Sequence, residues 1–313
     1  MFELSGCIIT QEQIRLWMNT FLPKEEPYYI DSDNELFNQI STLRLPVYSR
    51  FQFSEIARQF IGEYGASYSH WDVPATALIV YIDVLNIKDQ TLRAKLFAHQ
   101  AVLGRGQIYP FEWVKDISSE WFERLRESHY ASQNRIILTY DAWIQLPETI
   151  KTKWLLKWLH ERVEPSDTIN VDYSYIPGIC SRVIKDHVSR FPMTSGANCF
   201  SAAAGGLLGS SNVIENWLNV EQFFEVLKQE GLTSSRVLTH SDNTSISPHD
   251  ILVWENVNGD AVHAAYAVTD SLLFNKMGQF WFQPWQFVSL TDVWDYAGCL
   301  SNGGRISIYS IGG

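Results

Sequence analysis

The sequence predicts an α+β protein, with a mostly helical first part and an antiparallel sheet in its last third. Three observations lead to this prediction. Apolar residues recur at helical spacing through most of residues 1–190. A run of small residues suited to a closely packed helix begins at Cys199, and short β-like runs separated by turn signals follow it. Because the helices come first and the strands after, an α+β fold is favoured over alternating βαβ units.

This order of elements divides the chain into two expected domains. Residues 1–190 form a mostly helical region of unknown role, which either shapes a cleft or binds a partner. Residues 191–313 form the domain that carries the sheet. Turn-forming residues at 164–167 are the first candidate for a domain boundary. Residues 191–196, shortly before Cys199, are the second.

Several segments of the first region have the marks of helices. Thr10 and Gln13 form a capping-box pattern at the start of one helix, and Ser54 is placed to cap another. The almost continuously apolar residues 75–87 predict a buried core helix, whereas residues 135–140 fit either a short strand or more helix. Further helices are expected over residues 90–103, 111–130 and 148–163.

The pattern changes after residue 195. Two helices are expected over residues 199–209 and 220–230. A tight turn from Val268 to Leu272 predicts that the strand after it returns antiparallel to the strand beginning at His263. The expected strands cover residues 250–255, 262–269, 272–276, 280–282 and 305–310.

Composition excludes some classes of function. The 313 residues carry a formal net charge of −11, so nucleic acid or an anionic membrane would meet an adverse field. No apolar run is long enough to span a bilayer, and the start lacks the apolar core of a signal peptide. We therefore expect a cytoplasmic protein with free thiols. The four cysteines, Cys7, Cys180, Cys199 and Cys299, lack zinc-site spacing, so no metal or cofactor is expected.

Three residues of the last third have the chemistry of a nucleophilic site. Cys199 in the first turn of a helix would feel the positive end of the helix dipole, which lowers a thiol pKa, and free N–H groups there can receive an oxyanion. His263 begins a strand of small residues that is expected to pack on this helix, so its imidazole should face the thiol. Asn275, near the level of His263 on the returning strand, would orient the imidazole. Gln279 and Gln283 are alternatives for that third role.

The segments around these residues resemble the NlpC/P60 superfamily of cysteine peptidases, which have a papain-like core. The nucleophile motif resembles Asn198-Cys199-Phe200-Ser201, and a strand motif is similar to residues 248–254. The family's histidine strand is similar to residues 263–267, and its third polar residue falls where this chain has Asn275. The resemblance covers roughly residues 190–290. Asn198 stands where the family usually has Asp, and the family's wall-binding repeats are not evident in residues 1–190.

The resemblance implies a cysteine hydrolase that cleaves an amide bond through a thioester. Cys199 would be the nucleophile, His263 the base and then the acid, and Asn275 the orienting residue. The substrate would be a murein-type peptide or a small amide, and the expected substrate-contacting residues are Asn198, Phe200, Ser201 and Trp281. Two alternatives remain open: a catalytically inactive binding protein on the same scaffold, and a thiol acyltransferase or acyl-amide hydrolase whose acyl pocket is lined by the aromatic residues 280–285.

Overall fold

The computed structural model describes residues 1–31, 35–49, 51–53, 77–104, 106–128, 130–163, 182–238 and 246–311. The chain forms two compact units, Met1–Gln13 with Leu159–Gly313, and Ile14–Trp158. The expected division near residue 190 differs from this one, because an N-terminal hairpin joins the C-terminal unit: Ile8 N–H donates to the Ser189 carbonyl at 2.9 Å. The helix expected after Ser54 and the boundary signal at residues 164–167 lie outside the described residues.

The unit Ile14–Trp158 mixes helices with two small antiparallel sheets, so the expectation of a mostly helical first part is incomplete. The sheets have the orders β3-β5-β4 and β6-β8-β7. The helices are α1 (Gln11–Thr20), α2 (Glu35–Ser41), α4 (Gln90–Leu103), α5 (Phe111–Ile117), α6 (Ser119–Arg126), α7 (Tyr140–Gln145) and α8 (Glu148–His160), with a short 3-10 turn at Val84–Asn86. The strands are β3 (Glu26–Asp31), β4 (Val47–Ser49), β5 (Ala77–Ile82), β6 (Ile108–Pro110), β7 (Ala131–Ser132) and β8 (Arg135–Ile137).

Strand β5 corrects the helix expected over residues 75–87. It is the central strand of its sheet and pairs with β3 on one side and β4 on the other. A central strand buried on both faces has the same continuous apolar pattern as a buried helix, and the β-branched Ile79, Val80 and Ile82 favour the strand. Residues 135–140, which the pattern left open, begin with strand β8.

Local capping and turn signals predicted the start of α1 and the bounds of α4. The Thr10 and Gln13 pair forms the expected reciprocal bonds, with Thr10 N donating to Gln13 Oε1 at 2.8 Å and Gln13 N to Thr10 Oγ1 at 3.1 Å. Helix α4 has the predicted bounds and ends at Gly104 with φ 68°. The single helix expected over residues 111–130 is two helices, because the extended backbone of Ser118 ends α5 and its hydroxyl caps α6.

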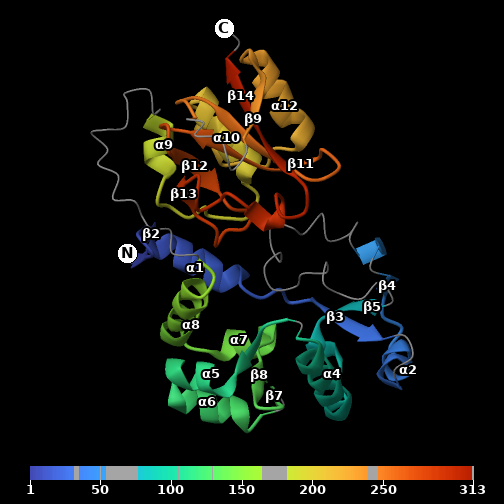
Figure 1. The fold of residues 1–313 in the computed structure, drawn as a ribbon. Helices are drawn as coiled ribbons and strands as arrows, with labels where there is room; N and C mark the ends of the chain where they lie inside the picture. Colours follow the sequence, from blue (N-terminus) through green and yellow to red (C-terminus); the bar gives the residue numbers. More distant parts are fainter. Residues whose placement is uncertain are drawn as a thin grey trace. The chain divides into compact units, whose positions relative to one another are not determined.

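The C-terminal unit is built on a six-stranded antiparallel sheet with the order β13-β12-β11-β10-β14-β9 (Figure 1). Its strands are β9 (Leu232–Leu238), β10 (Ile251–Glu255), β11 (Ala261–Ala267), β12 (Leu272–Lys276), β13 (Trp285–Ser289) and β14 (Arg305–Ile311), and the hairpin pairs β1 (Phe2–Leu4) with β2 (Cys7–Ile9). Its helices are α9 (Arg182–His187), α10 (Cys199–Leu208), α11 (Ser211–Ile214) and α12 (Val220–Gln229), with a 3-10 turn at Tyr296–Gly298. None of the described helices is long and apolar enough to cross a membrane.

Two strands of this sheet were not predicted, and one predicted strand is absent. Strands β9 and β13 occupy the two edges. Residues 280–282 form a turn, in which Phe280 N donates to Gln283 Oε1 at 3.1 Å. The expected hairpin is confirmed: β11 and β12 pair antiparallel, with Tyr266 opposite Phe274.

The two faces of the sheet bury different side chains, because successive residues of a strand point to opposite sides. We call the side packed on α10 the helix face, which includes Ile251, Val253, Ala264, Tyr266 and Phe274. We call the other side the aromatic face, which includes Leu252, Trp254, Ala265, Leu273 and Ile306 together with Trp294 and Tyr296. These faces decide where each candidate side chain points.

Replacing Gly205 by alanine is expected to destabilise the C-terminal unit by about 2–3 kcal/mol, since overpacking a tight contact costs that much. A Cβ at Gly205 would lie 2.3 Å from Ile214 Cγ1 and 2.7 Å from the backbone nitrogen of Ile214, where α10 meets α11. Gly206→Ala is the matched control, because its Cβ would first meet Tyr266 Cγ at 3.3 Å. Urea unfolding measures both, and equal midpoints for the two variants would contradict the prediction.

Candidate active site

Cys199 is the first residue of α10, and the residues around it hold the start of the helix in place. Asn198 is the N-cap: Ser201 N donates to its Oδ1 at 2.9 Å, and its own N–H donates to Ser201 Oγ at 2.9 Å. The Asn198 amide also donates to the Leu218 carbonyl at 2.8 Å. Phe200 packs on Phe223 with ring centroids 5.0 Å apart. The side chains of Asn198, Phe200 and Ser201, expected to contact substrate, are therefore engaged in capping and core packing.

Cys199 is 7% exposed, and its thiol lies among backbone N–H groups. Burial raises the pKa of Cys199 to about 11, while the N–H groups of Ala264, Phe200 and Cys199 itself oppose that rise by favouring the thiolate. The thiol is therefore protonated at neutral pH in this closed form. The N–H groups of a helix's first turn are also the kind of donor that stabilises an oxyanion.

His263 lies on the aromatic face at the start of β11. Its ring stacks on Tyr296, with centroids 4.0 Å apart and planes inclined by 23°, and lies edge-on to Trp254 at 5.2 Å. The side chain is fully buried, and neither ring nitrogen has a hydrogen-bond partner. Burial lowers the pKa of His263 to about 3, while the side chain of Asn275 opposes the fall. The imidazole is therefore neutral in this form.

Asn275 lies on the aromatic face beside His263. Its side chain is the polar group that raises the pKa of the imidazole, against the effect of burial. It is 1% exposed; its Nδ2 lies 2.9 Å from Met277 Sδ, and its Oδ1 has no partner. Gln283, one alternative for the orienting role, uses its Oε1 to accept from Phe280 N. The structure therefore brings His263 and Asn275 together, as the sequence suggested.

The structure does not bring the thiol and the imidazole into a hydrogen bond. Cys199 contacts the helix face at the N–H of Ala264, whereas the preceding residue, His263, points to the aromatic face. The pairing of β10 with β11 shifts register here: Trp254 lies opposite His263 and Glu255 opposite Ala261. From His263 onward the register is regular, so the ordinary alternation of the strand sets the face of His263. The expectation that His263 faces Cys199 is therefore corrected: the two residues meet the same strand from opposite faces.

Sequence reasoning missed Lys276, the last residue of β12. Its side chain is almost fully buried, and its Nζ donates to the carbonyls of Gly278 at 2.6 Å and Phe280 at 3.0 Å. Burial lowers the pKa of Lys276 to about 7, and the Cys199 thiolate opposes that fall. The available signal was its position: alternation from Phe274 places residue 276 on the helix face.

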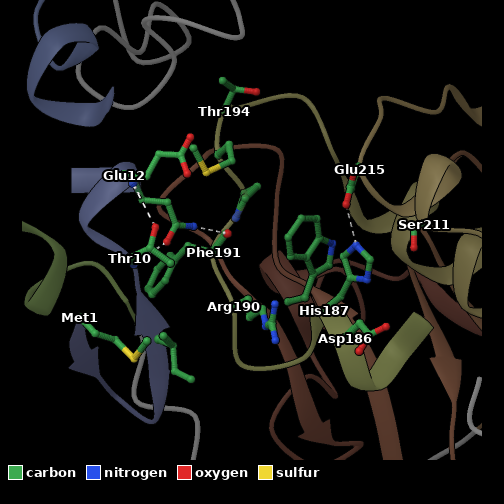
Figure 2. A pocket seen from close by; sticks show the side chains of 15 residues that line it. Met1, Thr10, Glu12, Asp186, His187, Arg190, Phe191, Thr194, Ser211 and Glu215 are labelled. Atoms are coloured by element: carbon green, nitrogen blue, oxygen red, sulfur yellow. Dashed lines mark hydrogen bonds and ion pairs between the residues drawn. The ribbon is translucent and has the colours of Figure 1, made fainter. Parts of the chain in front are cut away.

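A cavity of about 750 Å³ lies in the C-terminal unit (Figure 2). Part of its wall is the loop that leads to Cys199, from Phe191 to Thr194, and Trp285 lines it as well. His187 Nε2 and Glu215 Oε1, 3.0 Å apart, line it together, and Arg190 and Glu12 lie elsewhere on its wall. Trp281, expected to contact substrate, is buried, and its backbone N–H donates to Ser195 Oγ at 3.1 Å.

The chain matches no protein-family model, no curated protein and no solved structure. Within the described ranges, Cys7, Cys199 and Cys299 are free thiols. The same ranges hold no group of three or more His, Cys, Asp or Glu residues that could bind a metal ion.

Proposed function

We propose that the protein is a cysteine hydrolase of the NlpC/P60 type that cleaves an amide bond through a thioester at Cys199. One observation carries the proposal: a thiol at a helix start, among backbone N–H groups, contacts Ala264, the residue after His263, whose neutral ring has the side chain of Asn275 as its polar neighbour. A nucleophile with oxyanion donors thus lies on the helix face of β11, and a base with an orienting group lies on the aromatic face of the same strand.

The closed arrangement requires one movement before chemistry. The imidazole has to reach Sγ, from which the backbone of β11 separates it in this form, so the movement involves the strand or the start of α10; catalytic hydrogen bonds in unliganded enzymes are often long and tighten only with substrate. When substrate and water enter the site, Cys199 becomes less buried. The raised pKa of its thiol then falls, because burial is what raises it. The resting form is therefore a protected, neutral thiol.

The reaction then follows from the groups present. His263 takes the Sγ proton as Sγ bonds to the amide carbon, and the N–H groups of Cys199 and Phe200 hold the oxyanion. His263 gives that proton to the leaving amine as the C–N bond breaks, which leaves a thioester on Cys199. Water, deprotonated by His263, releases the acid and restores the thiol. Asn275 keeps the ring oriented.

The cavity beside the loop 191–194 is the place where we expect the substrate to be held. Trp285 of its wall pairs with Lys276, and Phe191 to Thr194 lead directly to Cys199. The cavity combines apolar surface from Phe191 and Trp285 with charged groups of both signs, which suits a short peptide better than a purely apolar acyl chain.

A catalytically inactive binding protein is the second candidate, and burial favours it. Cys199 is 7% exposed and His263 is fully buried, so both are closed to solvent in this form. A binding protein keeps that closure permanently, whereas a hydrolase opens it. The two candidates therefore differ in the reactivity of one thiol.

Acylation of Cys199 by p-nitrophenyl acetate tests the proposal. We expect a burst of nitrophenolate and an acetyl thioester found by peptide mass spectrometry at Cys199 and not at Cys7 or Cys299, which serve as internal controls. The Cys199→Ser variant should lose the burst. A wild-type protein that acylates no faster at Cys199 than at the other two thiols would favour the binding protein.

A further inference from the structure

We propose that the cavity beside the loop 191–194 binds short peptides with two free ends, holding the terminal carboxylate at Arg190 and the terminal ammonium at Glu12. The assignment of such a peptide as the substrate rests on the proposed function above. Binding itself needs no chemistry at Cys199 and can be measured in a protein without that thiol.

The size and composition of the cavity suit a ligand of this kind. Its volume of about 750 Å³ falls within the range of about 300–1,000 Å³ found for small-molecule sites. Phe191 and Trp285 give it apolar surface, and both side chains are held in place by burial. The charged side chains of the wall then decide which polar groups of a ligand bind there.

Three of the charged or titratable side chains on the wall already have a partner. His187 uses both ring nitrogens: Nδ1 lies 2.7 Å from the Val183 carbonyl oxygen, and Nε2 lies 3.0 Å from Glu215 Oε1. Asp186 forms an ion pair with Arg182, one turn earlier on α9, at 3.8 Å. A ligand that approached any of these three groups would compete with a bond that the protein already makes.

Arg190 and Glu12 are the charged side chains of the wall that remain. Both are exposed, neither has an ion pair or a side-chain hydrogen bond with another described residue, and they lie on different parts of the wall (Figure 2). A guanidinium group offers a fork of N–H donors that matches a carboxylate, and a carboxylate accepts from the N–H donors of an ammonium group. One cation and one anion on the described wall therefore fit a ligand that carries one charge of each sign.

Hydrogen bonds fix the backbone of Arg190. Its N–H donates to the His187 carbonyl at 3.1 Å, and its carbonyl accepts from Trp285 N at 3.0 Å. Arg190 also forms isolated bridges with Ile8 of β2 and with Trp285 of β13, the edge strand of the six-stranded sheet. Because the backbone is already ordered, binding a ligand costs only the ordering of the side chain.

The spacing of Arg190 and Glu12 fits a few residues of peptide. Arg190 pairs with Ile8, and Glu12 follows Ile8 closely in the chain, just after the start of α1. From the reach of an extended chain and the distance between paired strands, the Cα atoms of Arg190 and Glu12 are no more than about 19 Å apart. Both side chains reach into the same cavity, so the gap between their charged groups is shorter. A tripeptide, at about 3.3 Å per residue, spans about 10 Å.

The test is the binding of trialanine to the Cys199→Ser protein, measured by isothermal titration calorimetry at low ionic strength. Blocking one end, as in N-acetyl-trialanine or trialanine amide, removes one charge. We expect each block to weaken binding at least about tenfold, because hydrogen bonds to charged groups are worth that much or more. Adding Arg190→Gln should make trialanine and its amide bind equally while the acetylated peptide still binds more weakly. Adding Glu12→Gln should have the reverse effect.

Lys185→Gln is the matched control, because it removes an exposed positive charge of α9 that does not line the cavity. We expect it to distinguish the three peptides as the Cys199→Ser parent does. No binding of trialanine, equal affinities for the three peptides in the parent, or an undiminished preference for the matching free end in either variant overturns the inference. Binding as expected in a protein that is not acylated at Cys199 removes only the proposed function, whereas acylation without these preferences removes only this inference.

Discussion

Lowering the pH from 7 to 4 is expected to destabilise the C-terminal unit by about 3 kcal/mol through His263 alone, since one unit of pKa difference is worth about 1.4 kcal/mol. Burial lowers the pKa of His263 to about 3 in the folded chain, whereas an exposed imidazole titrates near about 6.5. Between these values the unfolded chain binds a proton and the folded chain does not. Stability is therefore complete above about pH 6.5 and falls as the pH falls through this window.

His263→Phe is the variant that isolates this effect. A phenyl ring keeps the stack on Tyr296 and the edge contact with Trp254, but it cannot take up a proton. We expect the variant to lose about 3 kcal/mol less than the wild type over the same pH interval, because every other titrating group is common to both proteins.

Urea unfolding at several pH values, with hydrogen exchange of the β11 amides to confirm which unit opens, measures the difference. His263→Leu repeats the experiment with a smaller side chain, in case the phenyl ring overpacks the site. Identical pH slopes for the wild type and both variants would show that the imidazole is solvated in the folded protein, against the burial described here.

Local signals were sufficient to predict where the candidate site begins. The small-residue run after Cys199 predicted the start of α10, where Asn198 and Ser201 form a reciprocal cap. The turn before Leu272 predicted that β12 returns along β11, and this brings Asn275 to His263. Each of these features depends on residues close together in the chain, which is why one sequence was enough.

The face that His263 occupies could not be predicted in the same way. A shift of one residue in pairing reverses every side chain of a strand, so whether His263 or Ala264 faces α10 is fixed only when β10 and β11 pair. The alternation of small residues after His263 looked compatible with packing on α10, but it is Ala264 and Tyr266 that pack there.

Long-range contacts account for the other differences. The N-terminal hairpin pairs with the chain near Ser189 and Arg190, far away in the sequence, so the division into units did not follow the change in local pattern. Lys276 looked like a polar residue at the end of a strand; only the turn that supplies the Gly278 and Phe280 carbonyls makes its burial possible.

Replacing His263 by alanine is expected to lower kcat/KM for amide hydrolysis about a thousandfold while the acylation of Cys199 by an activated ester falls much less. General acid–base catalysis by a positioned side chain contributes about a hundred- to ten-thousandfold. An amine leaves only after it gains a proton, whereas nitrophenolate leaves without one. The loss should therefore depend on the leaving group, which a merely structural defect does not produce.

A matched pair of an acetyl-peptide p-nitroanilide and p-nitrophenyl acetate measures this dependence, with His249→Ala as the control. His249 Nδ1 bonds the Tyr266 hydroxyl at 2.7 Å on the helix face, before β10, and has no part in the proposed proton transfers. We expect the control to retain wild-type rates with both substrates. If His263→Ala slows both reactions equally, the histidine supports the fold and not the proton transfer.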